Sequence, residues 1–202
     1  MEEIEKEDVK KLMETKGRAR GVVLKTDAEY VLVEKGGEGL KKVEKELGKL
    51  GHPLNYGKVK NMEFYPVGLR VLSLLVIKKV FNFDDEKIKD MGLMATKKSL
   101  IIKLFVRYFL SIKRVFFKEA PRIWQKHWNI GELVPLELDE EKKRALLQLK
   151  NFDLHPLYCS AYLRGYFTGI LQMLVKTSEI TCQETKCSFR GDEYHEYLLK
   201  WK

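Results

Sequence analysis

The C-terminal stretch from residue 156 to 202 constrains the fold more than any other part of the chain. It opens with an apolar, glycine-containing run at 156–176 and closes with two β-prone runs, ITCQETK and HEYLLKW, around Gly191. Apolar spacing of the first kind is typical of a helix, and β-prone runs on either side of a glycine are typical of paired strands. The chain is therefore predicted to end in a helix packed on an antiparallel strand pair.

Four side chains in this stretch can bind a metal ion: Cys159, Glu184, Cys187 and His195. Cys and His are the usual ligands of a structural zinc, and Glu can complete such a set. The spacing is not a paired C-x-x-C framework, so these residues meet only if the helix and the two strands converge. The alternative is that the cysteines pack as small hydrophobic side chains and that His195 forms a hydrogen bond on the sheet surface.

The rest of the chain alternates helical and β-prone patterns. Helices are expected at 4–16, 39–50, 66–81, 84–89, 91–118, around Trp124 and Trp128, and at 156–176; strands are expected at 21–26, 29–34, 133–138, 145–152 and on both sides of Gly191. The strands within 21–34 are predicted to form a hairpin. Pro121 is expected to end the long helix and to open the next helical turn, which carries Trp124 and Trp128. Runs of helices with mostly adjacent, antiparallel strands predict an α+β fold, with an antiparallel sheet packed against several helices.

Residues 159–201 resemble the closing signature of the 4-vinyl-reductase-type small-molecule-binding domain. That signature has a Cys near the start of a glycine-containing helix, then E-x-x-C-x-x-x-G-x-x-x-C and an aromatic final strand. The matching positions are Cys159, Gly165, Gly169, Glu184, Cys187, Gly191, His195, Tyr197 and Trp201. His195 departs from the pattern, because it stands where the family usually has its second motif Cys. A looser similarity covers the segments MGLMATKKSLI and APRIWQKHWNIGE.

The resemblance implies an α/β fold shared with haem–nitric-oxide-binding domains and Golgi transport-particle subunits. It also implies that 61–202 are the family domain and that 1–60 form an N-terminal helix–hairpin–helix extension packed on it, as one globular unit. A homodimer, a small apolar ligand and one zinc ion follow from the same resemblance. The implied zinc ligands are Cys159, Glu184, Cys187 and His195, whereas Cys182 has no counterpart in the signature and is expected to face away.

Aromatic side chains are the candidates for a ligand pocket, because such pockets are mostly hydrophobic with a few polar anchors. The predicted pocket residues are Phe105, Tyr108, Phe109, Phe116, Trp124, Trp128, Tyr162 and Phe167. The alternative is that they form an ordinary filled core. Haem is not expected, because none of the four histidines lies within 91–118, where the family resemblance would place the axial ligand, and the Tyr-x-Ser-x-Arg motif is absent.

Composition limits the function classes. The net charge of +9 is compatible with a nucleic-acid partner, but no RNA-binding signature or zinc-finger spacing accompanies it, so such binding is not expected. The acidic, polar start differs from a signal peptide, and the longest apolar run, at 71–77, is too short to span a bilayer. Three cysteines do not indicate a disulfide framework. We therefore expect a soluble, cytoplasmic protein.

No motif for a nucleophilic serine or cysteine is present, and no redox-cofactor motif was found, so catalysis is not expected. The function predicted from the sequence is a non-catalytic binding or sensor protein for an apolar or aromatic small molecule, with a structural zinc and a separate signalling partner. The first alternative is an assembly or adaptor subunit that resembles Golgi transport-particle proteins. The second is an enzyme of pigment or aromatic metabolism.

Overall fold

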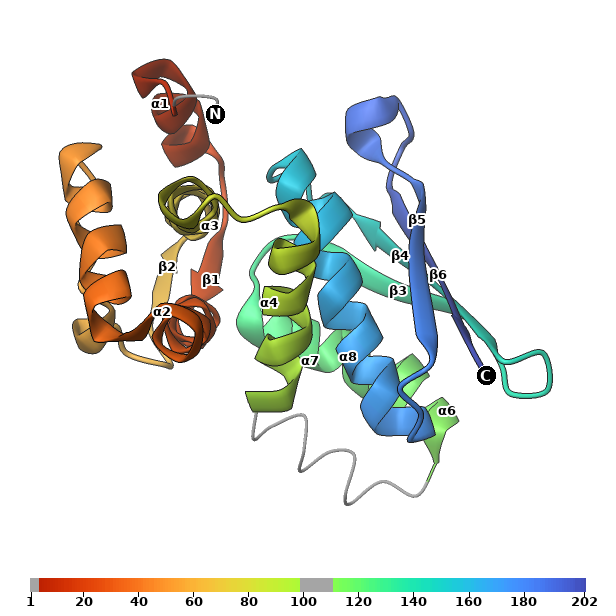
Figure 1. Cartoon of the computed structure of the whole chain (residues 1–202). Coiled ribbons are helices and arrows are strands. Elements are labelled where there is room, and N and C mark those ends of the chain that lie inside the picture. The colour runs from red at the N-terminus through yellow and green to blue at the C-terminus, as the bar shows by residue number, and fades with distance from the viewer. Residues whose placement is uncertain (1–3, 99–110) are drawn as a thin grey trace.

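The computed structural model describes residues 4–98 and 111–202, and its helices and strands form the predicted α+β fold (Figure 1). The first part, here named the N-terminal layer, comprises residues 4–81. Its elements are α1 (Lys6–Glu14), β1 (Arg18–Arg20), α2 (Gly21–Lys49), η1 (Tyr56–Lys58), β2 (Phe64–Pro66) and α3 (Val67–Phe81). The strands β1 and β2 pair antiparallel, and α3 packs against both α1 and α2.

The hairpin expected at 21–34 is wrong, because these residues begin the helical element α2. Leu24, Ala28 and Val31 are buried at intervals of three or four residues, which is the spacing of a helix face and not of a strand. Packing of this face overrides the β-propensity of its valines. Within α2, Gly36 marks a kink, with φ of 66° and ψ of −175°.

The second part, here named the C-terminal layer, comprises residues 85–202 without 99–110. Its helical elements are α4 (Asp85–Lys98), α6 (Ile112–Arg114), η2 (Val115–Glu119), α7 (Ala120–His127), η3 (Tyr158–Tyr162), α8 (Leu163–Val175) and η4 (Ser188–Arg190). Its strands are β3 (Glu132–Asp139), β4 (Arg144–Lys150), β5 (Ile180–Lys186) and β6 (His195–Trp201). Pro121 lies in the first turn of α7, as expected for the start of the next helix, and the π-helical turn η2 directly precedes it.

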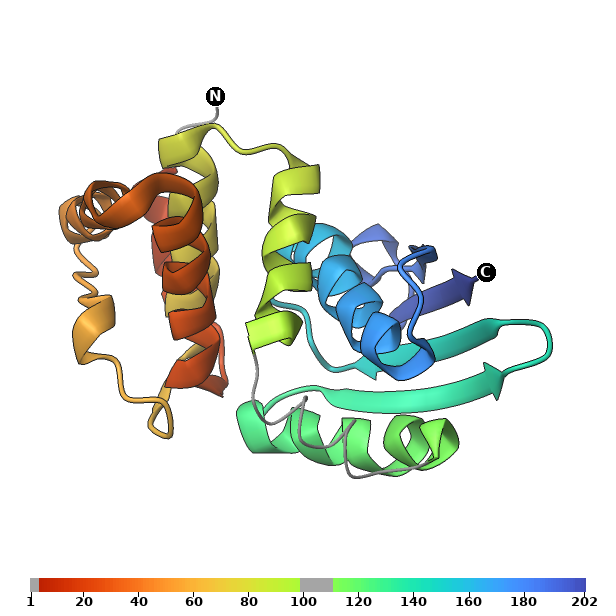
Figure 2. The ribbon, with the colours of Figure 1, turned by 60° about the horizontal axis from the view of Figure 1, so that its bottom comes forward.

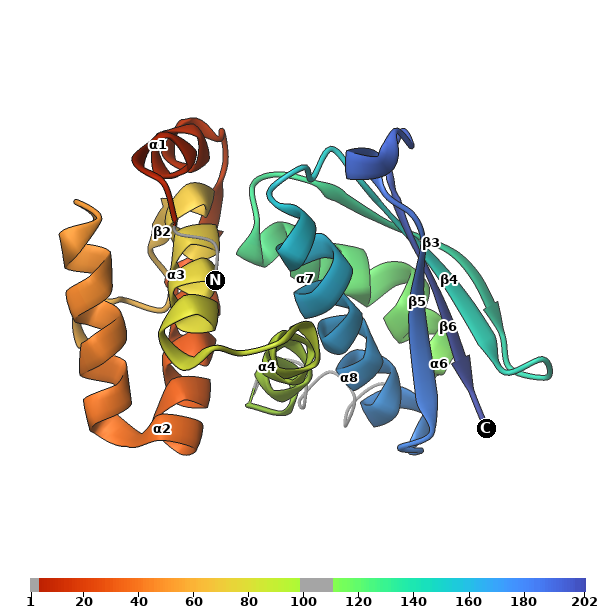
Figure 3. The same ribbon diagram turned by 45° about the horizontal axis from the view of Figure 1, so that its top comes forward.

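The four strands form one antiparallel sheet in the order β3-β4-β6-β5. In Figures 1 and 3, α8 and α7 cover one face of this sheet, and α4 lies between α8 and the N-terminal layer. Among the described helices, α4 and α8 make the most extensive contact. Gly165 permits this approach, since a Cβ atom there would lie 1.8 Å from the backbone oxygen of Lys89.

The two layers meet along a seam beside β1 (Figure 2). Ala19 forms an isolated antiparallel bridge with Trp128, and the backbone N–H of Asn129 donates to the carbonyl of Arg18 at 3.1 Å. The Nε of Arg20 donates to the carbonyl of Lys126. The seam therefore joins the N-terminal layer to the end of α7. Among the described residues, no helix is both long and apolar enough to cross a membrane.

Candidate functional sites

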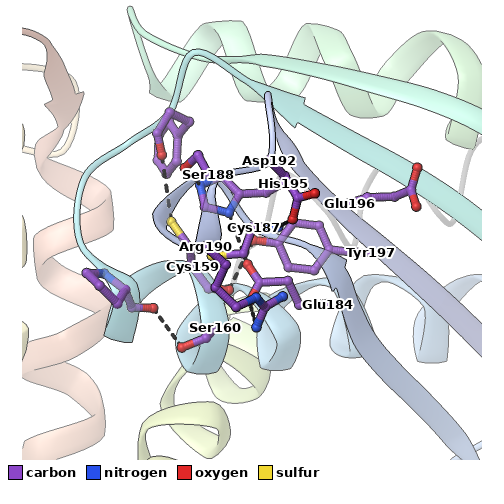
Figure 4. A network of polar contacts seen from close by, with 12 residues as sticks. Cys159, Ser160, Glu184, Cys187, Ser188, Arg190, Asp192, His195, Glu196 and Tyr197 are labelled. Carbon is purple, nitrogen blue, oxygen red and sulfur yellow. Dashed lines mark hydrogen bonds and ion pairs between the residues drawn. The ribbon is translucent and has the colours of Figure 1, made fainter.

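Three of the four predicted metal ligands come together where β5 and β6 meet (Figure 4). Glu184 lies on β5, Cys187 follows the end of that strand, and His195 is the first residue of β6. One ligand atom from each lies within 4.8 Å of the other two. The strand pairing produces this proximity, because Gly191 at φ of 95° allows the chain to turn back within a few residues.

Cys159 faces the same corner from η3, at the start of the facing helix (Figure 4). It is not one of the three mutually close ligands, and its Sγ lies 3.7 Å from the carbonyl oxygen of Phe152, to which it donates. The backbone carbonyl of Cys159 accepts a hydrogen bond from the Tyr197 hydroxyl at 3.0 Å. We name Cys159, Glu184, Cys187 and His195 together the C-terminal cluster. Its role as a metal site stays a prediction.

Cys182 does not face away as expected. It is buried on β5 two residues before Glu184, and residues two apart in a strand point to the same face of the sheet. Cys182 is nevertheless outside the group of close ligand atoms. Its absence from that group follows from distance along the strand and not from its orientation.

His195 is fully buried and both of its ring nitrogens have partners. Nδ1 lies 3.0 Å from Glu184 Oε1, and Nε2 lies 3.0 Å from Ser188 Oγ. Ser188 also donates to Asp153. Burial, followed by the Glu184 charge, raises the pKa of the Cys159 thiol, and burial likewise raises the pKa of the Cys187 thiol. In this arrangement the thiols are neutral, so metal binding would have to displace protons.

The described pocket candidates lie in two different places. Phe116 and Phe167 line a small apolar cavity between α8, η2 and the sheet, with Ala120, Leu133, Leu147, Ile170, Leu171, Leu174 and Leu199. Trp124, Trp128 and Tyr162 belong instead to a buried cluster of rings with Phe152 and Tyr158. Phe105, Tyr108 and Phe109 lie outside the described residues. The cavity measures about 20 Å³, which is room for little more than one water molecule.

A larger space, which the sequence did not indicate, lies where the two layers meet. We name it the interlayer groove, and it has a volume of about 620 Å³. Its walls are formed by Ile4, Asp8, Lys11, Leu12 and Thr15 near α1; Leu75, Lys78, Lys79, Asn82, Phe83 and Asp85 from α3 to α4; and Leu154, His155, Pro156, Leu157 and Ser160 near η3. A short loop thus contributes a histidine to this groove, and the other walls are formed by residues at least seventy positions earlier in the chain.

His155 is the titratable ring of this groove. It is half-buried, and burial lowers its pKa against a smaller opposing effect of Asp8. Its Nδ1 accepts a hydrogen bond from the backbone N–H of Leu157 at 3.1 Å. A neutral ring that accepts at Nδ1 carries its proton on Nε2.

No protein-family model matches the chain, and no curated protein matches its sequence. Solved structures do match. An H-NOX protein from S. oneidensis in the Fe(II)NO ligation state has 12% identity and a TM-score of 0.66, over 91% of this chain and 99% of the other. A variant of Tt H-NOX has 15% identity and a TM-score of 0.62, over 91% and 95%. A structure described under the modulation of haem redox potential by porphyrin distortion has 13% identity and a TM-score of 0.61, over 90% and 99%.

These matches correct the expected cofactor. The sequence led to zinc and no haem, whereas the descriptions of the similar structures name haem and ferrous iron, and zinc finds no support among them. The error arose because the argument against haem depended on the position of one histidine and on one short motif. At 12% identity a fold is retained while such local patterns are not. The narrower assignment to the 4-vinyl-reductase type stays a prediction. The fold of the chain is similar to that of the H-NOX domains over about nine-tenths of its length.

Proposed function

We propose that this chain is a non-catalytic sensor module that binds a small molecule in the interlayer groove. The groove itself carries the proposal, because its volume of about 620 Å³ falls in the range of small-molecule sites, about 300–1,000 Å³. Its walls come from both layers, so an occupant contacts both at once. A ligand that binds one arrangement of the layers better than another shifts the population toward that arrangement, which is how a binding site becomes a sensor.

Haem is the first ligand to test, because the similar structures are haem proteins. The groove fits such a group in volume, in apolar wall residues such as Leu12 and Leu75, and in the positive charge of Lys11 and Lys78 for acidic side arms. The lowered pKa of His155 keeps its ring neutral near neutral pH, as an iron ligand must be. The Leu157 N–H now holds the ring in the tautomer with Nε2 protonated, so ligation at Nε2 requires the other tautomer. Bound haem would supply an iron that takes diatomic gases.

A neutral apolar or aromatic compound is the second ligand class for the same groove. Leu12, Leu75, Phe83 and Leu157 give it continuous hydrophobic contact, and such a ligand would not need the histidine. Removing the His155 side chain should therefore abolish haem binding but leave the binding of an apolar compound unchanged. A homodimer and a separate signalling partner stay predictions, and sedimentation of the purified protein against the 23.7 kDa monomer mass tests the first.

The experiment is a titration of the purified protein with haem, followed by the Soret band, together with native mass spectrometry for a co-purified compound. His155→Ala should abolish the shift of the Soret band, while the matched control His52→Ala, outside the groove, should leave it unchanged. Leu75→Trp fills the groove and should block either ligand class, whereas Leu198→Trp, on the uncovered face of the sheet, should not. Saturable binding that survives Leu75→Trp, or no ligand in either assay, would reject the proposal.

A further inference from the structure

A buried ion pair lies at the centre of the molecule. Arg70, in the middle of α3, has 0% of its surface exposed, and it contacts the carboxylate of Asp27 on α2, which is also fully buried. Charged side chains are almost never this deeply buried unless they are paired. Both members belong to the N-terminal layer.

The guanidinium group of Arg70 also reaches across to the C-terminal layer. It lies over the rings of Tyr158 and Tyr162, at 5.1 Å and 4.7 Å from their centroids. The two rings stack on each other at 5.0 Å with an interplanar angle of 19°. Both tyrosines belong to η3, a π-helical turn, and single π-turns are uncommon and often occur at functional sites. One cation thus bridges the two layers through two aromatic faces.

This bridge connects the two walls of the interlayer groove. Leu75 and Lys78 of the groove follow Arg70 on α3 by one and two helical turns. On the opposite wall, Leu157 immediately precedes Tyr158, and Ser160 lies in the same π-turn. A change in the separation of Arg70 from the tyrosines therefore changes the width of the groove.

Hydrogen bonds from protein groups do not satisfy every polar atom of the pair. Nε of Arg70 and Oδ1 of Asp27 have no hydrogen-bond partner among the described residues. Oδ2 of Asp27 accepts from Ser73 Oγ at 3.4 Å, and Ser73 in turn shares a 2.6 Å hydrogen bond with the Tyr56 hydroxyl. Buried polar atoms without partners favour any rearrangement that lets water reach them.

We propose that Arg70, Asp27, Tyr158 and Tyr162 form a latch that holds the two walls of the interlayer groove together, and that opening it hydrates the ion pair and widens the groove. The coupling of the latch to a ligand depends on the proposed function, whereas the latch itself does not. Its state depends on pH through Asp27.

The sign of this dependence follows from the closed structure. Burial raises the pKa of Asp27 to about 7, against the opposing effects of Arg70 and Ser73. In an open, hydrated state the carboxyl returns toward its ordinary pKa of about 3.9. The closed state therefore binds a proton that the open state releases, so it is favoured as pH falls below about 7 and opening is favoured as pH rises through that value.

Four tyrosines surround the pair: Tyr56 of η1, and Tyr158, Tyr162 and Tyr166 of the C-terminal layer. Glu44 accepts a hydrogen bond from the backbone N–H of Tyr56. Burial raises the pKa of each of these four tyrosines above its ordinary value, so they stay protonated. Substituting Asp27 therefore tests the pH dependence of the latch separately from these tyrosines.

Hydrogen exchange followed by mass spectrometry on the ligand-free full chain tests the latch at pH about 5.5 and about 8, after correction for intrinsic exchange. Peptides that cover 155–165 should lose protection several-fold at the higher pH in the wild type. Asp27→Asn should abolish this difference between the two pH values. Asp85→Asn, which removes a carboxylate from the groove but not from the latch, should retain it. Equal pH dependence in the wild type and Asp27→Asn would overturn the proposal.

Tyr158→Leu provides a second route if Asp27→Asn does not fold. It removes one aromatic face and should lower the protection of 155–165 at both pH values, and unchanged protection would count against the latch.

Haem titrations at the same two pH values then test the coupling of the latch to a ligand. Binding that depends on pH in the wild type but not in Asp27→Asn supports it, while binding with the same pH dependence in both rejects it. Absence of haem binding in every protein argues against haem as the occupant and leaves the exchange result to decide the latch.

Discussion

His195 is the residue on which the C-terminal cluster depends. It is the direct partner of Glu184, whose side chain is only 4% exposed and whose nearest other cation, Arg190, lies 3.7 Å away. His195→Ala should therefore lower the free energy of unfolding by about 3 kcal/mol, because it leaves a buried carboxylate with only the longer contact to the exposed Arg190. Ser188→Ala removes the hydrogen bonds of this hydroxyl to His195 and to Asp153, near the surface, and should cost about 1–2 kcal/mol. Urea unfolding measures both, and equal losses for the two variants would contradict this assignment.

The three cysteines should be unreactive in the folded protein. All three are free and buried, and burial raises the pKa of each thiol, that of Cys182 to about 12. The thiolate is the form that reacts with a maleimide. Labelling at about pH 8, which is about half a unit below the ordinary thiol pKa, should therefore be slow until denaturant is added. Mass spectrometry counts the labels. Rapid labelling of one cysteine in the native state would show that its thiol is more accessible than the structure indicates.

Some of the site residues could be predicted from the sequence, and others could not. Glu184, Cys187 and His195 were brought together correctly, because a strand–turn–strand places such residues opposite one another regardless of distant packing. Arg70 and His155 were missed, since their partners are set by how two layers meet. Arg70 carried a signal nonetheless: it lies in α3, a helix with buried residues all around it, where no solvent-exposed face is left for a charge.

At the scale of elements, contact between α4 and α8 requires glycine. Gly165→Ala should lower the free energy of unfolding by about 2–3 kcal/mol, because its Cβ would lie 1.8 Å from the Lys89 carbonyl oxygen and the helices would have to separate. Gly48→Ala, near the end of α2, is the matched control, since nothing lies within 4 Å of its Cβ. It should stabilise the protein by about 0.5–1 kcal/mol through higher helix propensity. Thermal and urea unfolding compare the two variants, and a neutral Gly165→Ala would show that the helices are not in close contact.

Elements were predictable where local pattern and tertiary packing agree. The helix at 66–81 and the strands of the C-terminal sheet follow their apolar spacing, and α1 ends near Gly17 as expected. The hairpin predicted within 21–34 was wrong because a run rich in valine is compatible with both a strand and a helix face. Only burial against α3 decides between them. Pro121 was placed correctly at the start of the helix that carries Trp124, because proline is tolerated in a first turn.

The arrangement of the whole molecule bears on whether its two layers fold as one unit. The expected division at residue 60 stays a prediction, and α3, which follows it, packs on α1 and α2. The Arg70 bridge, the Ala19–Trp128 pairing and the Arg20 hydrogen bond all cross between layers, so opening one layer leaves a buried cation and several backbone groups without partners. The free-energy cost of leaving these groups without partners favours unfolding of the two layers as one unit.

The chain allows this coupling to be measured without introducing a probe. All three tryptophans, Trp124, Trp128 and Trp201, lie in the C-terminal layer, whereas α2 and α3 contribute much of the helical circular dichroism from the N-terminal layer. Urea unfolding followed by tryptophan fluorescence and by far-ultraviolet circular dichroism should give coincident transitions, as cooperative unfolding requires. Replacing Arg70 by methionine removes the charge and its contact with the tyrosines, and should move the two transitions apart. Two separate transitions in the wild type would instead show that the layers are independent domains, and the interlayer groove would then lie at an interface that opens on its own.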